Sequence, residues 1–98
     1  MTALTPGVSL ALVRTLTPRL RRGAVLDAKG ACLAGDRDLA ARAQRALEGS
    51  AEGVVRTAEG LHAASDGRHT IAAEAGPEVL GGLLLADLRA ALAALEVR

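Results

Sequence analysis

The first apolar block of the chain has the spacing of a helix. Val8, Leu12 and Leu16 recur every four positions and define an apolar helix face. Pro18 predicts the end of this helix, because a proline pushes the residue before it out of helical angles. The apolar run at 23–26 then shows no clean alternation, and it predicts a strand that is buried on both faces.

Turn and cap residues divide the next part of the chain. Gly30 predicts a tight turn that leads into a second strand at 31–34. Asp36 is a good N-cap for a helix predicted at 37–48, and Gly49 is a good C-terminal stop. One face of this helix is apolar and the other carries charged residues, so we expect it to cover a sheet.

The second half of the chain has the pattern of three short strands followed by a helix. β-Branched residues and turn signals predict a meander with strands at 53–59, 61–65 and 69–75. Asp66 and Gly67 are the strongest hairpin signal, because Gly supplies the positive φ that a two-residue turn needs. A final helix is predicted at 83–95, with a seam formed by Leu84, Leu88, Leu92 and Leu95.

These elements form a single predicted domain, residues 1–98, in the order helix, two strands, helix, three strands, helix. The order, the segments RGAVLDAKGACLAGD (22–36) and GLLLADLRAALAAL (82–95) and the Asp66–Gly67 hairpin together resemble the roadblock domain, the dynein-light-chain roadblock-type family, in its single-domain bacterial form. The resemblance implies an α/β (α+β) roadblock/profilin-like fold, with a five-stranded, mainly antiparallel sheet and helices on both faces. Longin-like domains have a similar order and are an alternative.

The roadblock resemblance also implies a homodimer. In that family the third strand pairs with its twin and the middle helices pack side by side, so the implied interface residues are Ala40, Ala43, Leu47, Val54, Val55, Arg56 and Thr57. Arg42 and Arg45 would border the paired helices, on the surface that bacterial relatives present to Ras-like GTPases. The implied function is that of a non-catalytic regulatory or scaffold protein that binds and modulates a small Ras-like GTPase. A dimeric scaffold without a GTPase partner is the alternative, and a solvated position is the simpler interpretation of each arginine.

Composition limits the classes of partner. The chain has no Phe, Trp or Tyr, so its core must be built from Leu, Val, Ile and Ala. It also lacks the aromatic platforms on which single-stranded nucleic acids stack, and its net charge is only +1. We therefore expect no nucleic-acid partner. A domain of this size buries only about 60–65% of its unfolded surface, which favours dimerisation.

The hairpin carries the candidate chemistry of the chain. His62 and His69 flank its turn, with Ser65, Asp66 and Arg68 nearby. These residue types could form a Ser-His-Asp set or a two-histidine metal site. The preferred interpretation is a polar hairpin end with two exposed histidines, because a triad is defined by geometry and zinc has no evident third ligand. We expect no catalytic residue, no metal and no cofactor, and the glycines lack the spacing of a nucleotide loop.

The remaining sequence signals concern the thiol and the location of the protein. Cys32 is the single cysteine, so an internal disulfide is impossible, and its apolar strand predicts a buried free thiol. The N-terminal residues lack the basic region of a secretory signal. The apolar C-terminal stretch carries Asp87 and Arg89 and is short for a membrane span. We therefore expect a cytoplasmic protein without membrane insertion.

Overall fold

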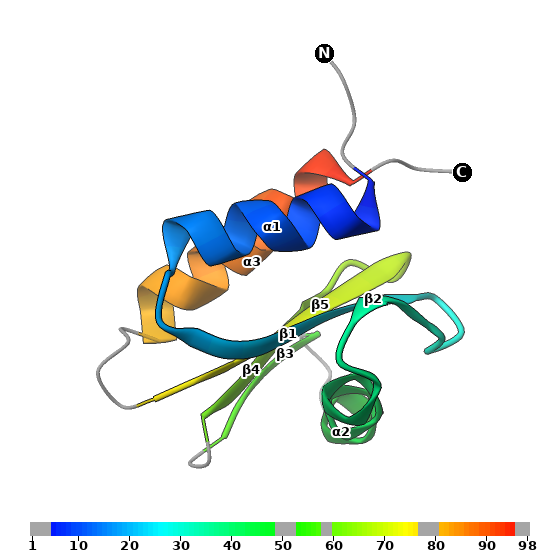
Figure 1. Ribbon diagram of the computed structural model, residues 1–98. Coiled ribbons are helices and arrows are strands. Elements are labelled where there is room, and N and C mark those ends of the chain that lie inside the picture. The colour runs from blue at the N-terminus through cyan, green and yellow to red at the C-terminus, as the bar shows by residue number, and fades with distance from the viewer. Residues whose placement is uncertain (1–4, 49–52, 58–59, 77–80, 96–98) are drawn as a thin grey trace.

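The elements follow one another in the predicted order (Figure 1). The computed structural model describes residues 5–48, 53–57, 60–76 and 81–95. Its helices and strands are α1 (Pro6–Leu16), β1 (Leu20–Asp27), β2 (Cys32–Gly35), α2 (Arg37–Glu48), β3 (Val54–Arg56), β4 (Leu61–Ser65), β5 (His69–Ala75) and α3 (Gly81–Ala94). Several boundaries differ from the sequence predictions, and the second strand, predicted at 31–34, lies one residue later. The third strand is shorter than 53–59, of which 58 and 59 lie outside the described residues, and the last helix begins two residues earlier than predicted.

Local side-chain hydrogen bonds form the predicted turns and the predicted cap. Asp27 closes the first turn, where its Oδ1 accepts hydrogen bonds from the backbone N–H groups of Lys29 and Ala31, each at 2.9 Å. Asp36 caps α2, because its Oδ1 accepts from the Leu39 N–H at 2.9 Å. In the hairpin, the Asp66 Oδ1 likewise accepts hydrogen bonds from the backbone N–H groups of Arg68 and His69, each at 2.9 Å. The predicted stop at residue 49 lies outside the described residues.

The strands form one sheet in the order β2-β1-β5-β4-β3, and every pairing is antiparallel. The prediction of an α+β fold with a five-stranded antiparallel sheet is therefore confirmed. β1 and β5 lie at the centre of the sheet. Their central residues are buried, as predicted for the apolar run at 23–26.

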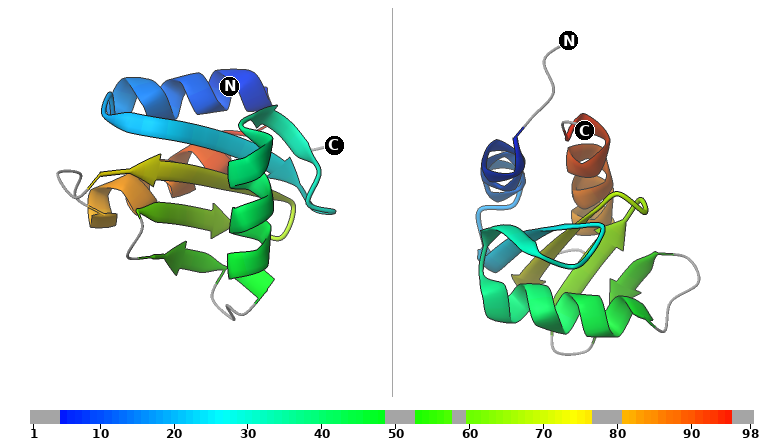
Figure 2. Two further views of the ribbon diagram at one scale, coloured as in Figure 1. Left: turned by 60° about the horizontal axis from the view of Figure 1, so that its bottom comes forward. Right: turned by 90° about the vertical axis from the view of Figure 1, so that its right-hand side faces the viewer.

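Helices cover the sheet from two sides, with α1 and α3 on one side and α2 on the other (Figures 1 and 2). The side chains divide into two apolar clusters that match this arrangement. Under α1 and α3 the cluster contains Leu10, Val13, Val25, Ile71, Leu84, Leu88 and Leu92, and under α2 it contains Ala24, Leu26, Leu39, Ala40, Ala43, Leu61, Ala63 and Ala72. The predicted leucine seam of the last helix is confirmed, because all four leucines are buried.

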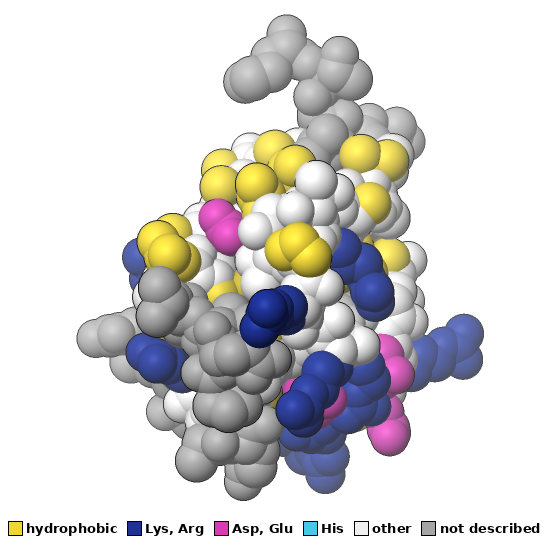
Figure 3. Space-filling view, turned by 60° about the vertical axis from the view of Figure 1, so that its left-hand side comes forward, with side chains coloured by type: hydrophobic (Ala, Val, Ile, Leu, Met, Phe, Trp, Pro, Cys, Tyr) yellow, Lys and Arg dark blue, Asp and Glu magenta, His cyan; other side chains and the backbone are white. Residues whose placement is uncertain are grey.

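The buried side of α1 is not the predicted apolar face. Val8, Leu12 and Leu16 are 53%, 37% and 51% exposed, whereas Ser9, Leu10 and Val13 face the interior. Two contacts with distant segments set this orientation. Leu10 packs closely on Gly23, and a Cβ added at position 23 would lie 2.5 Å from the Cδ1 atom of Leu10. The Ser9 hydroxyl donates a hydrogen bond to the Ala91 carbonyl at 3.2 Å. Hydrophobic side chains consequently lie on the surface near these helices (Figure 3).

Candidate interaction surface

β3 is an edge strand of the sheet. Within the described residues it pairs with β4 and with no other strand. The Gly53 carbonyl accepts from the Ser65 N–H, and the Thr57 N–H donates to the Leu61 carbonyl. Because backbone groups alternate in direction along an antiparallel strand, the N–H of Arg56 points away from β4. Such an edge is a template for pairing with another strand.

α2 crosses the sheet and contacts β3 as well as β1, β4 and β5 (Figure 2). Its outward side includes the exposed residues Ala41 and Arg45. Ala40 and Ala43, which the sequence places in an interface between two helices, are instead only 2% and 0% exposed. Both methyl groups pack against the sheet of their own chain, so these two residues leave little surface for contact with a second helix.

The other predicted interface residues lie at or near the edge of the sheet. Leu47 packs partly against the core under α2. Val54 and Val55 are half-buried in β3, and the Arg56 side chain is exposed. Thr57 follows the strand, and its hydroxyl accepts from the Leu61 N–H at 3.2 Å. We call β3 together with the exposed Ala41 and Arg45 the edge surface.

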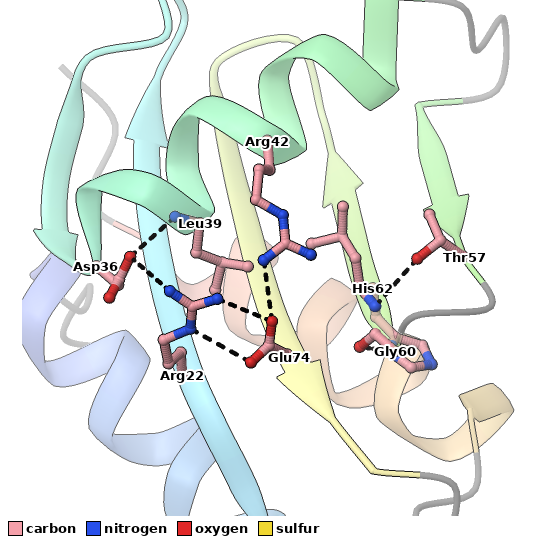
Figure 4. A network of polar contacts seen from close by, with 9 residues as sticks. Arg22, Asp36, Leu39, Arg42, Thr57, Gly60, His62 and Glu74 are labelled. Atoms are coloured by element: carbon pink, nitrogen blue, oxygen red, sulfur yellow. Dashed lines mark hydrogen bonds and ion pairs between the residues drawn. The ribbon is translucent and has the colours of Figure 1, made fainter.

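The two predicted partner-binding arginines of α2, Arg42 and Arg45, have different surroundings. Arg45 is exposed and forms no ion pair with another described residue. Arg42 is half-buried, and its guanidinium donates to the Glu74 carboxylate at 3.0 Å (Figure 4). Arg42 is therefore held by its own chain, and of the two predicted partner-binding arginines only Arg45 is fully available.

Glu74 is the centre of an ion-pair network that joins β1, β5 and α2 (Figure 4). Arg22 donates to both carboxylate oxygens of Glu74, at 3.3 Å from Nε and 2.9 Å from Nη2, which is a bidentate pair. Arg22 also contacts the capping carboxylate of Asp36 at 3.4 Å. Only 15% of the Glu74 side chain is exposed. The network fixes the start and the middle of α2 to the sheet.

The charges in this network shift each other's titration. Hydrogen bonds from Arg22 and then Arg42 lower the pKa of Glu74. The hydrogen bond with Glu74 raises the pKa of Arg22. The pKa of Asp36 is lowered mainly by the hydrogen bond from the Leu39 backbone. All of these groups are charged at neutral pH. The ion-pair network of Arg22, Asp36, Arg42 and Glu74, which we call the clamp, therefore carries its full charge there.

Sequence reasoning missed this network because its members are far apart along the chain. Arg22 and Glu74 are separated by 52 positions. A signal was nevertheless present, since each is a charged residue next to an apolar strand core. A charge at such a position requires a partner, although the sequence does not say which residue supplies it.

The two histidines do not form the expected exposed pair. His62 is only 5% exposed, and its Nδ1 lies 2.9 Å from the Gly60 carbonyl, to which it donates. Its cross-strand neighbours are Arg56 and Ala73, and not His69. Burial lowers the pKa of His62, and the charge of Arg56 adds to this effect.

The neighbouring polar residues of the hairpin are engaged in its turn. The Ser65 hydroxyl accepts from the Gly67 N–H at 3.2 Å, and the Asp66 carboxylate accepts from the Arg68 and His69 N–H groups. The described residues contain no group of three or more His, Cys, Asp or Glu side chains placed to hold a metal ion. These contacts give the polar side chains of the hairpin a structural role.

The thiol and the helices complete the description of the sequence candidates. Cys32 is half-buried, which is less than the predicted full burial, and its Sγ lies 3.3 Å from the Ala34 carbonyl. No helix in the described part of the chain is long and apolar enough to cross a membrane.

No family model matches the chain, and a search of the curated proteins finds no match.

Proposed function

We propose that this chain is a non-catalytic, homodimeric interaction protein of the roadblock type, which binds and modulates a small Ras-like GTPase in the cytoplasm. The element order and the five-stranded antiparallel sheet support the proposal, since they match the arrangement that the sequence resemblance implies. The polar side chains of the hairpin serve its turn, which favours a binding role over catalysis.

The single observation that carries the proposal is the position of β3 at the sheet edge, with α2 in contact with it. An edge strand whose Arg56 N–H points away from β4, beside a helix that exposes Ala41 and Arg45, provides a backbone hydrogen-bond donor and a side-chain surface together. Antiparallel pairing of two copies of β3 would cover both edges and make one continuous sheet. Ala40 and Ala43 are buried, so α2 contributes to the proposed dimer interface only through its outward side.

The proposed GTPase contact uses Arg45, because it is the exposed one of the two arginines that the resemblance places on the partner surface. Arg42 would act indirectly, since its bond to Glu74 fixes the helix that presents Arg45. This arrangement favours docking, in which a charged surface sets the association rate and orientation. No arginine-finger role is proposed.

The dimer is tested by a pair of substitutions at one position. Arg56→Pro removes the outward N–H of β3 and keeps the hydrogen bonds that Gly53 and Thr57 form with β4. Arg56→Ala keeps that N–H. We expect the proline variant to be less associated than the wild type and the alanine variant to be unchanged, measured by light scattering after gel filtration. Equal masses for the wild type and a natively folded proline variant would contradict the β3 interface.

The GTPase partner is tested by affinity capture from native lysate. The bait is the wild-type chain, with a non-hydrolysable GTP analogue in one sample and GDP in the other. We expect a small GTPase to be enriched in one nucleotide state, and Arg45→Glu to weaken its capture by about tenfold. Arg68→Glu, at the exposed hairpin turn, is the matched control. Capture that ignores the nucleotide would instead favour a dimeric scaffold without a GTPase.

A further inference from the structure

The surface formed by α1 and α3 is apolar where a monomer normally exposes polar groups. Of the large hydrophobic side chains that are exposed in the described residues, all but Leu33 belong to these two helices. Val8, Leu12 and Leu16 form a stripe along α1, because residues four positions apart share a helix face. Leu83, which is 64% exposed, lies at the start of α3. An exposed apolar surface of this kind marks an interaction site.

A hollow connects the two helices at one end of this surface. It has a volume of about 320 Å³, and Leu16 and Leu83 both line it. Arg19 and Asp87 line the same hollow. The Thr17 hydroxyl donates to Asp87 Oδ2 at 3.3 Å, which leaves the other carboxylate oxygen for a further contact. Neither Arg19 nor Asp87 forms an ion pair with another described residue. We call the stripe, Leu83 and the hollow the α1/α3 surface.

We propose that the α1/α3 surface binds a second copy of itself. An interface with two-fold symmetry needs a self-complementary surface, on which each group finds its complement at another position of the same surface. The α1/α3 surface has this property, because it carries one cation and one anion in the same apolar hollow. In the proposed pair, Arg19 of each copy meets Asp87 of the other, while the leucines of both copies lose contact with water.

The charges favour a second copy over other occupants. An anionic lipid surface attracts clusters of basic residues, and here Asp87 offsets Arg19. A strongly acidic or strongly basic partner would meet one charge of its own sign in the hollow. Ala86 and Ala90, exposed on α3, have short side chains that allow close approach of another helix.

This surface is separate from the edge surface. α1 and α3 lie on the opposite side of the sheet from α2 (Figures 1 and 2), and β3 contributes no residue to the hollow. A chain that associates through both surfaces forms assemblies larger than a dimer. The wild type should therefore be heavier than a dimer at high concentration, and loss of either interface should reduce the assembly to a dimer.

The experiment is a charge exchange in the Arg56→Pro chain, whose β3 edge is blocked. Masses are measured by sedimentation equilibrium at tens to hundreds of micromolar. We expect the Arg56→Pro chain to be dimeric. Adding Arg19→Asp or Asp87→Arg should give monomers, because like charges then face each other across the two-fold axis. Adding both exchanges together should restore the dimer.

Leucine substitutions provide the matched control for the apolar part of the surface. Leu16→Asp in the same chain should give monomers, whereas Leu33→Asp, at an exposed leucine on β2, should leave the dimer intact. A monomeric Arg56→Pro chain with a native circular dichroism spectrum would overturn the proposal, and so would a charge exchange that does not restore association. The α1/α3 proposal and the β3 proposal can fail separately. If Leu16→Asp, introduced into the wild-type chain with its β3 edge intact, gives monomers, then the chain has no β3 interface.

Discussion

The two sides of the sheet hold their helices by different means. Under α2 the core is built mostly from small side chains, because many of them are alanines. An ion-pair network around Glu74 adds to the contacts between α2 and the sheet. Under α1 and α3 the core contains more leucines, and its polar contacts are two single hydroxyl hydrogen bonds, from Ser9 and Thr17. Ion pairs thus add to apolar packing in orienting α2, whereas α1 and α3 are oriented mainly by apolar packing.

This difference explains what each side presents to solvent. Charged contacts are directional, so the clamp on Glu74 fixes which side of α2 faces outward, and that side is polar. The orientation of α1 depends on the close packing of Leu10 on Gly23 and on the Ser9 hydroxyl bond to Ala91, and it leaves an apolar stripe outside. Side-chain polarity alone is therefore a poor guide to the buried side of a helix that is apolar on two faces.

The largest expected effect concerns the leucine core under α3. Leu88 is fully buried, and Leu88→Ala should lower the free energy of unfolding by about 2–5 kcal/mol, through lost burial and the cavity that remains. Urea denaturation followed by circular dichroism measures the loss. Leu83→Ala, on the exposed side of the same helix, should stay within about 0.5 kcal/mol. Equal losses for the two variants would contradict the assignment of the buried side.

The next effect concerns the clamp under α2. Glu74→Gln keeps the shape of the side chain but leaves two arginines without their carboxylate. We expect a loss of about 1–2 kcal/mol in the free energy of unfolding, which is moderate because both arginine side chains are a third exposed to water. The control is Glu48→Gln, at an exposed position of α2, which should change stability little.

Acid should remove the advantage of the clamp. The folded pKa of Glu74 is lower than its ordinary value of 4.5, so its contribution is complete above that pH and is lost as the pH falls through the folded pKa. The stability difference between the wild type and Glu74→Gln should therefore shrink on acidification below about pH 5. Urea midpoints measured at several pH values test this, and a difference that stays constant to acid pH would contradict the clamp.

A milder pH effect should come from His62, on the other side of the sheet. Burial lowers its pKa below the ordinary 6.5, so the unfolded chain takes up a proton first and stability falls as the pH drops below about 6.5. His62→Asn, whose amide can donate to the Gly60 carbonyl, should flatten the stability profile between pH 7 and 5.5. An unchanged slope in His62→Asn would contradict the burial of this imidazole as the cause of the pH dependence.

The smallest expected effect concerns the exposed stripe. Leu12→Gln removes an exposed apolar side chain from α1, and it should change the free energy of unfolding by less than about 0.5 kcal/mol. Thermal unfolding at low protein concentration measures this without self-association. Val13→Gln, one position further and fully buried, should unfold the chain or lower its stability by about 2 kcal/mol or more.

The order of the elements was predictable because its signals are local. Asp27, Asp36 and Asp66 each accept hydrogen bonds from backbone N–H groups within four residues, so their turns and caps are determined by neighbouring sequence. The orientation of α1 was not predictable, because Leu10 meets Gly23 and Ser9 meets Ala91, and these contacts exist only in the folded chain.

The candidate surface was predicted in part for the same reason. The residues in and after the third strand follow from the chain order, but the helix residues depend on how α2 rotates onto the sheet. That rotation is set by Leu39, Ala40 and Ala43 in the core and by the bond from Arg42 to Glu74. An alanine in an amphipathic helix has the same sequence signature whether it meets its own sheet or another helix.

The central position of β5 has a consequence for the order of folding. β1 can pair with β2 through a tight turn, but its other neighbour in the sheet is β5, and the Arg22–Glu74 bond across that pair joins residues 52 positions apart. Closing so long a loop costs entropy before any contact is gained, so the β1–β5 pairing is expected to form late. Until β1 pairs with β5, α2 lacks both the strands on which it packs and the ion pairs of the clamp. The apolar cores on the two sides of the sheet therefore become complete when this pairing forms.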